Sequence, residues 1–149
     1  MVLEQEEGIS VRPARSDDAA FINGLWKGAD RVDVSETKAR LVALIKDPGE
    51  IIAVAEMDDR PVGFVHAGRT RTLYEDLAVN LVGLFVDDDH RGRGVGRVLM
   101  SVVEAWGRAI GAHDVRYECD QDQDRAGSFC RDFGYRIASA RDRCVKSLV

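Results

Sequence analysis

Apolar side chains recur every three to four residues in four stretches of the chain, which predicts four helices. The strongest pattern begins near Gly94 and ends at Gly111, a residue type that commonly closes a helix. Its apolar face consists of Val95, Val98, Leu99, Val102, Val103, Trp106 and Ile110. The other helices are predicted to begin at Ser16, near Asp33 and at Arg125, with Ser16 and Asp33 as N-terminal caps.

Strands are predicted where apolar and polar side chains alternate or where apolar residues run together. They are Ile9–Arg12, Glu50–Glu56, Pro61–Arg69, Ala78–Val86 and Val115–Cys119, followed by a terminal hairpin of Tyr135–Ser139 with Cys144–Leu148. Ala78–Val86 is apolar on both faces, which favours a place inside the sheet. The predicted order is β-α-α-β-β-β-α-β-α-β-β, a mixed α/β sheet flanked by about four helices. With 149 residues and no linker or repeat, a single domain over 1–149 is expected.

Charge and cysteine content narrow the classes of function. The formal net charge is −5, so nucleic acid is not an expected partner. The three cysteines have no metal-site spacing, and their odd number favours reduced thiols in a cytoplasmic protein without a metal. No apolar run approaches the ~18 residues of a membrane span, and the first residues lack the apolar core of a signal peptide, so no membrane partner is expected.

The segment from Arg91 to Arg97, RGRGVGR, places glycines and arginines between a predicted strand and the strongest helix. Glycines let backbone N–H groups approach a ligand, and the helix start presents unpaired donors and a positive dipole end. The spacing fits neither GxxxxGK[ST] nor G-x-G-x-x-G, because the last position of the second pattern falls on Arg97. A turn with solvated arginines is the alternative, but the flanking strand and helix favour a pyrophosphate site.

Arg91 to Gly96 also fits R/Q-x-x-G-x-G/A and resembles the acetyl-CoA pyrophosphate loop of the GNAT superfamily of N-acetyltransferases. The preceding LFV, the later AGSFCRDFGY and the element order resemble the family as well, over nearly the whole chain. The resemblance implies a mostly antiparallel GNAT sheet and acetyl-CoA as the cosubstrate. It implies that pantetheine is lined by Leu84, Phe85 and Val86. The residues it implies for the pyrophosphate are Arg91, Gly92, Arg93, Gly94, Val95, Gly96 and Arg97.

One position departs from the family, which often carries a tyrosine that protonates the leaving thiolate of CoA. This chain has Cys130 there. A thiol with an ordinary pKa of about 8.5 can donate a proton, so Cys130 is a catalytic candidate. The alternative, which we prefer, is a small buried residue in helix packing, with the proton coming from water or from the substrate.

An acidic segment, YECDQDQD, follows a predicted strand and supplies candidates for the acceptor site. Transfer to an amine needs a base to remove the ammonium proton, and carboxylates also attract a cationic substrate. Glu118 and Asp120 are candidates for these roles. A solvated acidic loop is the alternative, and for Asp122 and Asp124 it is preferred, with one of them capping the next helix.

The same region resembles the aminoglycoside 6′-N-acetyltransferase branch of the family. The resemblance rests on Leu25-Trp26 at the end of an early helix, a strand similar to PVGFLEGIYV, and Asp120. A glutamate that the branch carries falls on Val82 here, which removes a substrate-binding carboxylate. Trp26 is a candidate wall of the acceptor pocket or a core residue. Glu75 and Asp76 are further candidates for binding the substrate.

The expected function is therefore transfer of acetyl from acetyl-CoA to a primary amine of a small cationic acceptor, aminoglycoside-like or polyamine-like, by direct attack in a ternary complex. Acetylation of a protein or peptide amine and a non-catalytic CoA-binding regulatory module are the alternatives. The expected partners are the small-molecule amine and a second copy of the chain in a homodimer. His66 and His113 are interpreted as structural, because the sequence identifies no partner for either.

Overall fold

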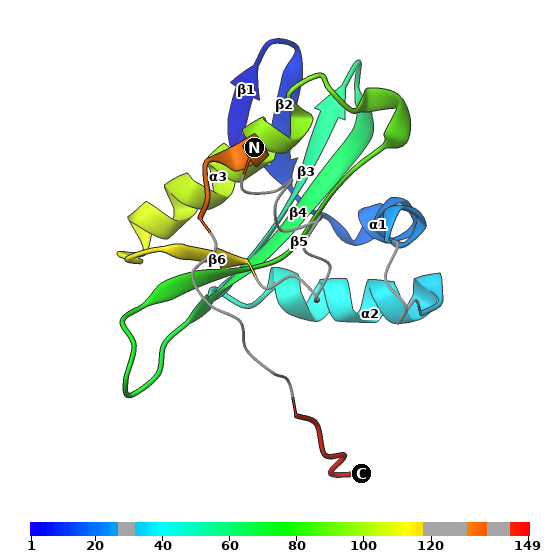
Figure 1. The fold of residues 1–149 in the computed structure, drawn as a ribbon. Coiled ribbons are helices and arrows are strands. Elements are labelled where there is room, and N and C mark those ends of the chain that lie inside the picture. The colour runs from blue at the N-terminus through cyan, green and yellow to red at the C-terminus, as the bar shows by residue number, and fades with distance from the viewer. Residues whose placement is uncertain (27–31, 118–130, 137–143) are drawn as a thin grey trace. The chain divides into compact units, whose positions relative to one another are not determined.

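The computed structural model describes residues 1–26, 32–117, 131–136 and 144–149. The chain forms two compact units, Met1–Glu118 and Cys119–Val149. The first unit contains a six-stranded sheet whose strands follow one another in chain order (Figure 1). Neighbouring strands are antiparallel except for the last pair, which is parallel. This confirms the mixed, mostly antiparallel α/β architecture expected from the sequence.

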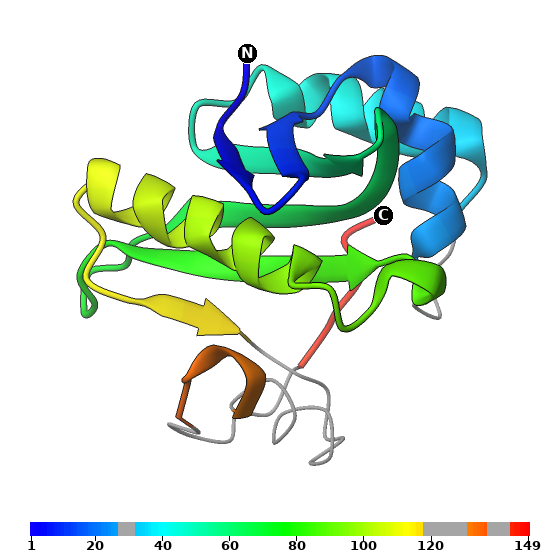
Figure 2. The ribbon, with the colours of Figure 1, turned by 90° about the horizontal axis from the view of Figure 1, so that it is seen from above.

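The element bounds agree closely with the apolar pattern in the first unit. The strands are β1 (Glu4–Glu6), β2 (Ile9–Pro13), β3 (Glu50–Met57), β4 (Arg60–Thr70), β5 (Ala78–Val86) and β6 (Val115–Tyr117). The helices are α1 (Ala19–Leu25), α2 (Val34–Ile45) and α3 (Val95–Ala109), with the short 3-10 turns η1 (Ser16–Asp18) and η2 (Asp88–His90). Figure 2 shows α3 on one face of the sheet and α1 and α2 on the other.

Each face of the sheet is covered by a separate apolar layer. On the α3 face, the buried side chains of the helix are Val95, Val98, Leu99, Met100, Val102 and Val103. On the α1/α2 face, a cluster of Ala14, Ala19, Leu41, Val54 and Phe64 is packed by partly buried residues that include Trp26 and Phe85. The helical periodicity therefore predicted the buried side of α3, because a helix on a sheet buries one stripe.

The hairpin at the N-terminus was not expected from the sequence. β1 pairs antiparallel with β2, and the connecting turn places Glu7 and Gly8 at φ values of 50° and 80°. Two consecutive residues with positive φ are typical of a tight hairpin turn. The side chains of β1 are all polar, so the strand forms through backbone pairing and leaves no apolar alternation to detect.

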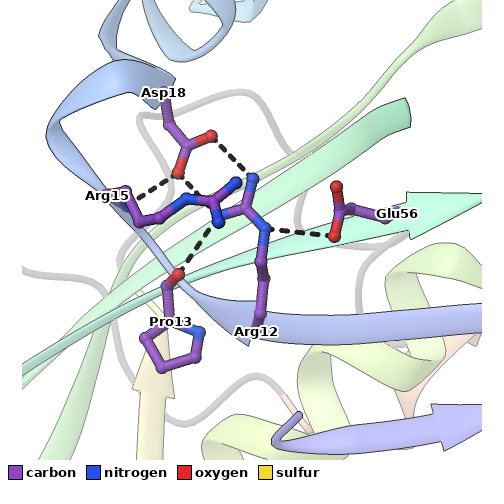
Figure 3. Close-up of polar contacts among 5 residues, drawn as sticks. All are labelled: Arg12, Pro13, Arg15, Asp18 and Glu56. Carbon is purple, nitrogen blue, oxygen red and sulfur yellow. Dashed lines mark hydrogen bonds and ion pairs between the residues drawn. The ribbon is translucent and has the colours of Figure 1, made fainter. Parts of the chain in front are cut away.

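A buried ion pair, and not Ser16, organises the start of α1 (Figure 3). Both guanidinium Nη atoms of Arg12 donate to the carboxylate of Asp18 at 2.8 Å, and the backbone N–H of Arg15 donates to the same carboxylate at 2.7 Å. Arg12 also donates to Glu56 at 3.1 Å. The predicted capping by Ser16 is wrong, because Ser16 lies inside η1 and its side chain makes no cap.

The predicted ends of the other two helices are confirmed. Asp33 caps α2, with its side chain accepting a hydrogen bond from the backbone N–H of Glu36 at 2.9 Å. Gly111 follows α3 with φ of 82°, and its N–H donates to the carbonyl of Arg108. These contacts are local in sequence, which is why the spacing of residue types was sufficient to predict them.

Two β-bulges change the register of the central strands. Ala55 pairs with Gly63 but Glu56 pairs with Pro61, so Val62 is an extra residue in β4. Ala67 pairs with Leu81 but His66 pairs with Gly83, so Val82 is an extra residue in β5. A one-residue shift moves the following side chains to the other face of a sheet, so these bulges decide which residues meet.

The second unit is described over two short ranges. Residues 131–133 are helical and Gly134 follows with φ of 73°, as expected for the end of the fourth helix. The start predicted for that helix at Arg125 lies outside the described residues. The predicted terminal hairpin is wrong where it can be compared, because Tyr135, Arg136 and residues 144–148 are not in strands. The rest of its first strand lies outside the description.

Candidate functional site

The glycine-rich loop joins the end of β5 to an uncapped end of α3. Gly94 is the N-terminal cap of α3, adopts φ of 86° and provides no capping side chain. The first helical hydrogen bond runs from the N–H of Val98 to the carbonyl of Gly94 at 3.1 Å. The preceding amides, those of Val95, Gly96 and Arg97, are therefore left for other acceptors. An oxyanion is a suitable acceptor, because the positive end of the helix dipole lies there.

The three arginines of the loop are exposed but differ in their partners. Arg91 pairs with Asp88 at 3.1 Å, and Arg97 pairs with Glu6 of β1 at 2.9 Å. The hydrogen bond and the charge of Glu6 raise the pKa of the Arg97 guanidinium. Arg93 has no hydrogen bond or ion pair among the described residues. As far as the described residues go, Arg93 is thus free to pair with a ligand, whereas Arg91 and Arg97 would have to leave their carboxylate partners to do so.

Beside the loop, β5 has an edge that no other described strand pairs with, which we call its open edge. Within the described residues, β6 pairs with β5 only at Val79, Asn80 and Leu81. From Gly83, just after the bulge, to Val86, the opposite edge of β5 is paired with β4. The open edge includes the predicted pantetheine residues Leu84, Phe85 and Val86, and it leads into the loop. Such an edge suits an extended ligand that carries amides.

Trp26, at the C-terminal end of α1, lies against this part of β5. Its ring centroid is 5.1 Å from that of Phe85, which in turn stacks on Phe64 at 5.4 Å. Both Trp26 and Phe85 are half-buried. Trp26 therefore combines the two interpretations made from the sequence, because it packs on the core cluster and also faces the strand expected to hold pantetheine.

Glu75 and Asp76 lie at the other end of β5, in the connection from β4. They line an open hollow of about 490 Å³ together with His113. Glu75 accepts from Arg116 at 2.7 Å, and this hydrogen bond raises the pKa of Arg116. Trp26 lies beside Gly83, and the stretch of β5 from Ala78 to Gly83 spans roughly 17 Å at the rise of a strand. Glu75 and Asp76 are therefore not brought together with Trp26, contrary to their grouping in one acceptor pocket.

The remaining candidates for the chemistry, Glu118, Asp120 and Cys130, lie outside the described residues. Among those described, no group of three or more His, Cys, Asp or Glu side chains could hold a metal ion. None of the described helices is both long enough and apolar enough to cross a membrane.

The structure gives a partner to each histidine that was interpreted as structural. His66 Nε2 is 3.0 Å from a carboxylate oxygen of Glu50, and His113 Nδ1 is 3.9 Å from Asp76. The contact between His66 and Glu50 was not predicted from the sequence. If β3 and β4 paired regularly from the turn at Asp58 and Asp59, Glu50 would lie opposite Ala67. Its side chain would then be on the face of the sheet away from His66. The extra residue in β4 places it beside His66.

Comparisons with known proteins identify the family and the fold. Residues 19–135 match the model of the acetyltransferase (GNAT) family. No curated protein sequence matches the chain significantly.

Among solved structures, the aminoglycoside 6′-N-acetyltransferase AAC(6')-IG from Acinetobacter haemolyticus is 16% identical, with a TM-score of 0.80 over 93% of this chain and 99% of that one. AAC(6')-Iy, in complex with a bisubstrate analogue of CoA and acetylneamine, is 21% identical, with a TM-score of 0.71 over 93% and 100%. A structure described as a transcriptional regulator from Bacillus halodurans C-125 is 18% identical, with a TM-score of 0.77 over 93% and 99%. These likenesses show a shared fold. With the family match covering most of the sequence, the chain belongs to the GNAT family of N-acetyltransferases.

Proposed function

We propose that the chain transfers acetyl from acetyl-CoA to a primary amine of a small cationic acceptor, by direct attack in a ternary complex. The observation that carries the proposal is the uncapped end of α3 beside the open edge of β5. Pyrophosphate is placed on Arg91 to Arg97, and pantetheine runs along Leu84 to Val86. That placement directs the acetyl group toward the bulge at Val82, next to Trp26.

An aminoglycoside-like or polyamine-like acceptor is proposed for two reasons. Several structural neighbours are aminoglycoside acetyltransferases, and one was solved in complex with sisomicin. Trp26 offers a flat apolar wall to a sugar ring or an alkyl chain. The acidic segment with Glu118 and Asp120 is proposed to attract the cationic amine and to assist in removing its proton.

A panel of amines tests this function directly. The purified chain is incubated with acetyl-CoA and, in turn, aminoglycosides, polyamines and a lysine peptide, while thiol release is followed and products are identified by mass spectrometry. We expect sustained thiol release and an acetylated product with an aminoglycoside or a polyamine. A product only from the peptide would favour protein acetylation. Binding of acetyl-CoA without turnover on any amine would favour a regulatory module.

A single domain over 1–149, a homodimer and a cytoplasmic location stay predictions.

Asp120→Asn is expected to lower kcat/KM for the best amine at least tenfold and to leave acetyl-CoA affinity unchanged. The substitution keeps the shape and removes the charge, and a hydrogen bond to a charged group contributes about 1.5–3 kcal/mol. Steady-state kinetics and calorimetry measure the two quantities. Asp124→Asn is the control and is expected to behave like the parent. Equal activity of the parent and both variants would show that the acidic segment is only solvated.

Cys130→Ser is expected to keep turnover within a few-fold of the parent, because we place Cys130 in helix packing. Loss of an obligate general acid costs on the order of 10²–10⁴-fold in rate. Measurement of kcat under saturating acetyl-CoA and amine decides between the two roles. A loss of that size, with an unchanged unfolding temperature, would identify Cys130 as the proton donor.

A further inference from the structure

A histidine and a carboxylate meet on the α1/α2 face of the sheet, directly across from the bulge in β5. His66 of β4 pairs in register with Gly83, the residue after the extra Val82. His66 Nε2 lies 3.0 Å from Glu50 Oε2, and the two side chains are 20% and 25% exposed. The other ring nitrogen, Nδ1, has no partner among the described residues. This arrangement leaves one nitrogen held and the other available to accept a proton.

A glycine makes the contact between the two side chains possible. A Cβ atom on Gly68 would lie 2.5 Å from Glu50 Oε2 and 2.9 Å from its carboxyl carbon. The carboxylate of Glu50 therefore lies over the backbone of β4 at a position where any other residue would displace it. The contact of the Glu50 carboxylate with His66 therefore depends on the absence of a side chain at Gly68.

A second glycine lies opposite His66 and is bordered by aromatic rings. A Cβ atom on Gly83 would approach the ring of Phe85 to 2.8 Å and that of Trp26 to 3.5 Å. Leu84, which follows Gly83, is one of the residues proposed to line pantetheine. The histidine, the aromatic wall and the proposed acetyl position are thus all within one or two residues of the bulge.

The surroundings of His66 contain few charges. Within the described residues, Glu50 of β3 is the one charged side chain at ion-pair distance from His66. β5 contributes the uncharged Val82 and Gly83 opposite it. The charged side chains of α2, namely Glu36, Lys38 and Arg40, are exposed. The glutamate that the resemblance to the aminoglycoside 6′-N-acetyltransferase branch implied at this point of β5 is Val82 in this chain.

We propose that His66 is the catalytic base of acetyl transfer and that Glu50 is the positioning residue that holds its ring. This inference rests on the proposed function. Nδ1 of His66 takes one proton from the substrate ammonium group. The neutral nitrogen then forms a bond to the acetyl carbonyl carbon, and the C–S bond breaks with its electron pair leaving on sulfur. The second proton of the nitrogen passes to the thiolate of CoA, and the imidazolium returns its proton to solvent. Glu118 and Asp120 then serve to bind the cation.

The test compares the parent with His66→Gln, His66→Ala, Glu50→Gln and the control His113→Gln, using the best amine of the panel. His113 is 67% exposed and lies at the other end of β5. We expect His66→Gln to lower kcat at least 100-fold with unchanged acetyl-CoA affinity, and free imidazole to restore part of the activity of His66→Ala. The fall in the parent's kcat/KM on the acid side of neutrality should be lost in His66→Gln. Glu50→Gln should lower kcat about tenfold at unchanged KM, and His113→Gln should match the parent.

The outcomes separate this inference from the proposed function. If the parent releases no thiol with any amine, the proposed function fails first. If the parent turns over and His66→Gln keeps both its rate and its acid limb, His66 is structural and only this inference fails. A lower unfolding temperature with normal kcat leads to the same conclusion. Should His66→Gln not fold, a parent profile without an acid limb or the absence of imidazole rescue would overturn the assignment.

Discussion

Gly96→Asp is expected to raise the dissociation constant of acetyl-CoA at least 100-fold while the protein keeps its unfolding temperature. Gly96 is half-buried in the first turn of α3, beside the amides that have no helical partner. An acidic residue in the first turn suits the helix dipole, so the fold is not weakened. The new carboxylate would, however, occupy the space proposed for the pyrophosphate. Two like charges ~4 Å apart near a protein surface repel by roughly 4 kcal/mol, more than the ~2.7 kcal/mol of a 100-fold change.

Calorimetry on the folded variants measures this effect, and Gly96→Asn is the matched control. Asparagine has nearly the same shape without the charge, so it is expected to weaken binding by a smaller factor. Gly94 is less suitable for substitution, because its φ of 86° strains any other residue whether or not a ligand binds. Arg91→Ala should weaken binding less than Gly96→Asp, since the backbone donors remain. An unchanged dissociation constant in Gly96→Asp would rule out a phosphate site at this helix end.

Asp18→Asn is expected to reduce the free energy of unfolding by about 3–5 kcal/mol, the usual cost of removing one partner from a buried ion pair. The side chains of Arg12 and Asp18 are 11% and 7% exposed, and the contact is bidentate. The amide of asparagine accepts fewer of these hydrogen bonds and leaves Glu56, at 3.1 Å, as the remaining counter-charge of the guanidinium. For a chain of this length, each kcal/mol lowers the unfolding temperature by roughly 2–4 °C.

At acidic pH, the free energies of unfolding of the parent and of Asp18→Asn should become more similar. Burial raises the pKa of Asp18, but the hydrogen bonds from Arg12 and from the Arg15 backbone, with the charge of Arg12, outweigh it and hold the pKa below its usual value. A lowered pKa means that the stabilisation is present above the ordinary value of about 3.9 and is lost as pH falls through the folded-state pKa. Urea unfolding at pH 7 and near pH 3 measures both differences.

The exposed pair of Arg40 and Glu36 gives the control for this prediction. Their side chains are 60% and 52% exposed, and they are one helical turn apart. Glu36→Gln removes a charge of the same sign and is expected to change stability by less than about 1 kcal/mol, because solvent screens the pair. If the two substitutions have equal effects, the buried pair is not what stabilises the start of α1.

Local features of the sequence were sufficient to predict most elements and the candidate anion site. The bounds of β5, the cap at Asp33 and the end of α3 at Gly111 follow from residue types a few positions apart. The glycine-rich loop was predictable for the same reason, since its strand, loop and helix are consecutive. β1 was missed because its pairing is a backbone interaction that leaves no side-chain pattern.

The sequence by itself determined most of the strands and helices of the first unit, and it showed that a glycine-rich loop leads into α3. Only the tertiary structure decided which side chains meet across the sheet. Counted from the two-residue turn, Glu50 would pair with Ala67 on the α3 face, yet it pairs with Gly68 and contacts His66. The extra residue Val62 causes this change, because side chains alternate between faces and one inserted residue reverses the alternation. A bulge arises from the packing of both faces at once, so periodicity along one strand does not reveal it.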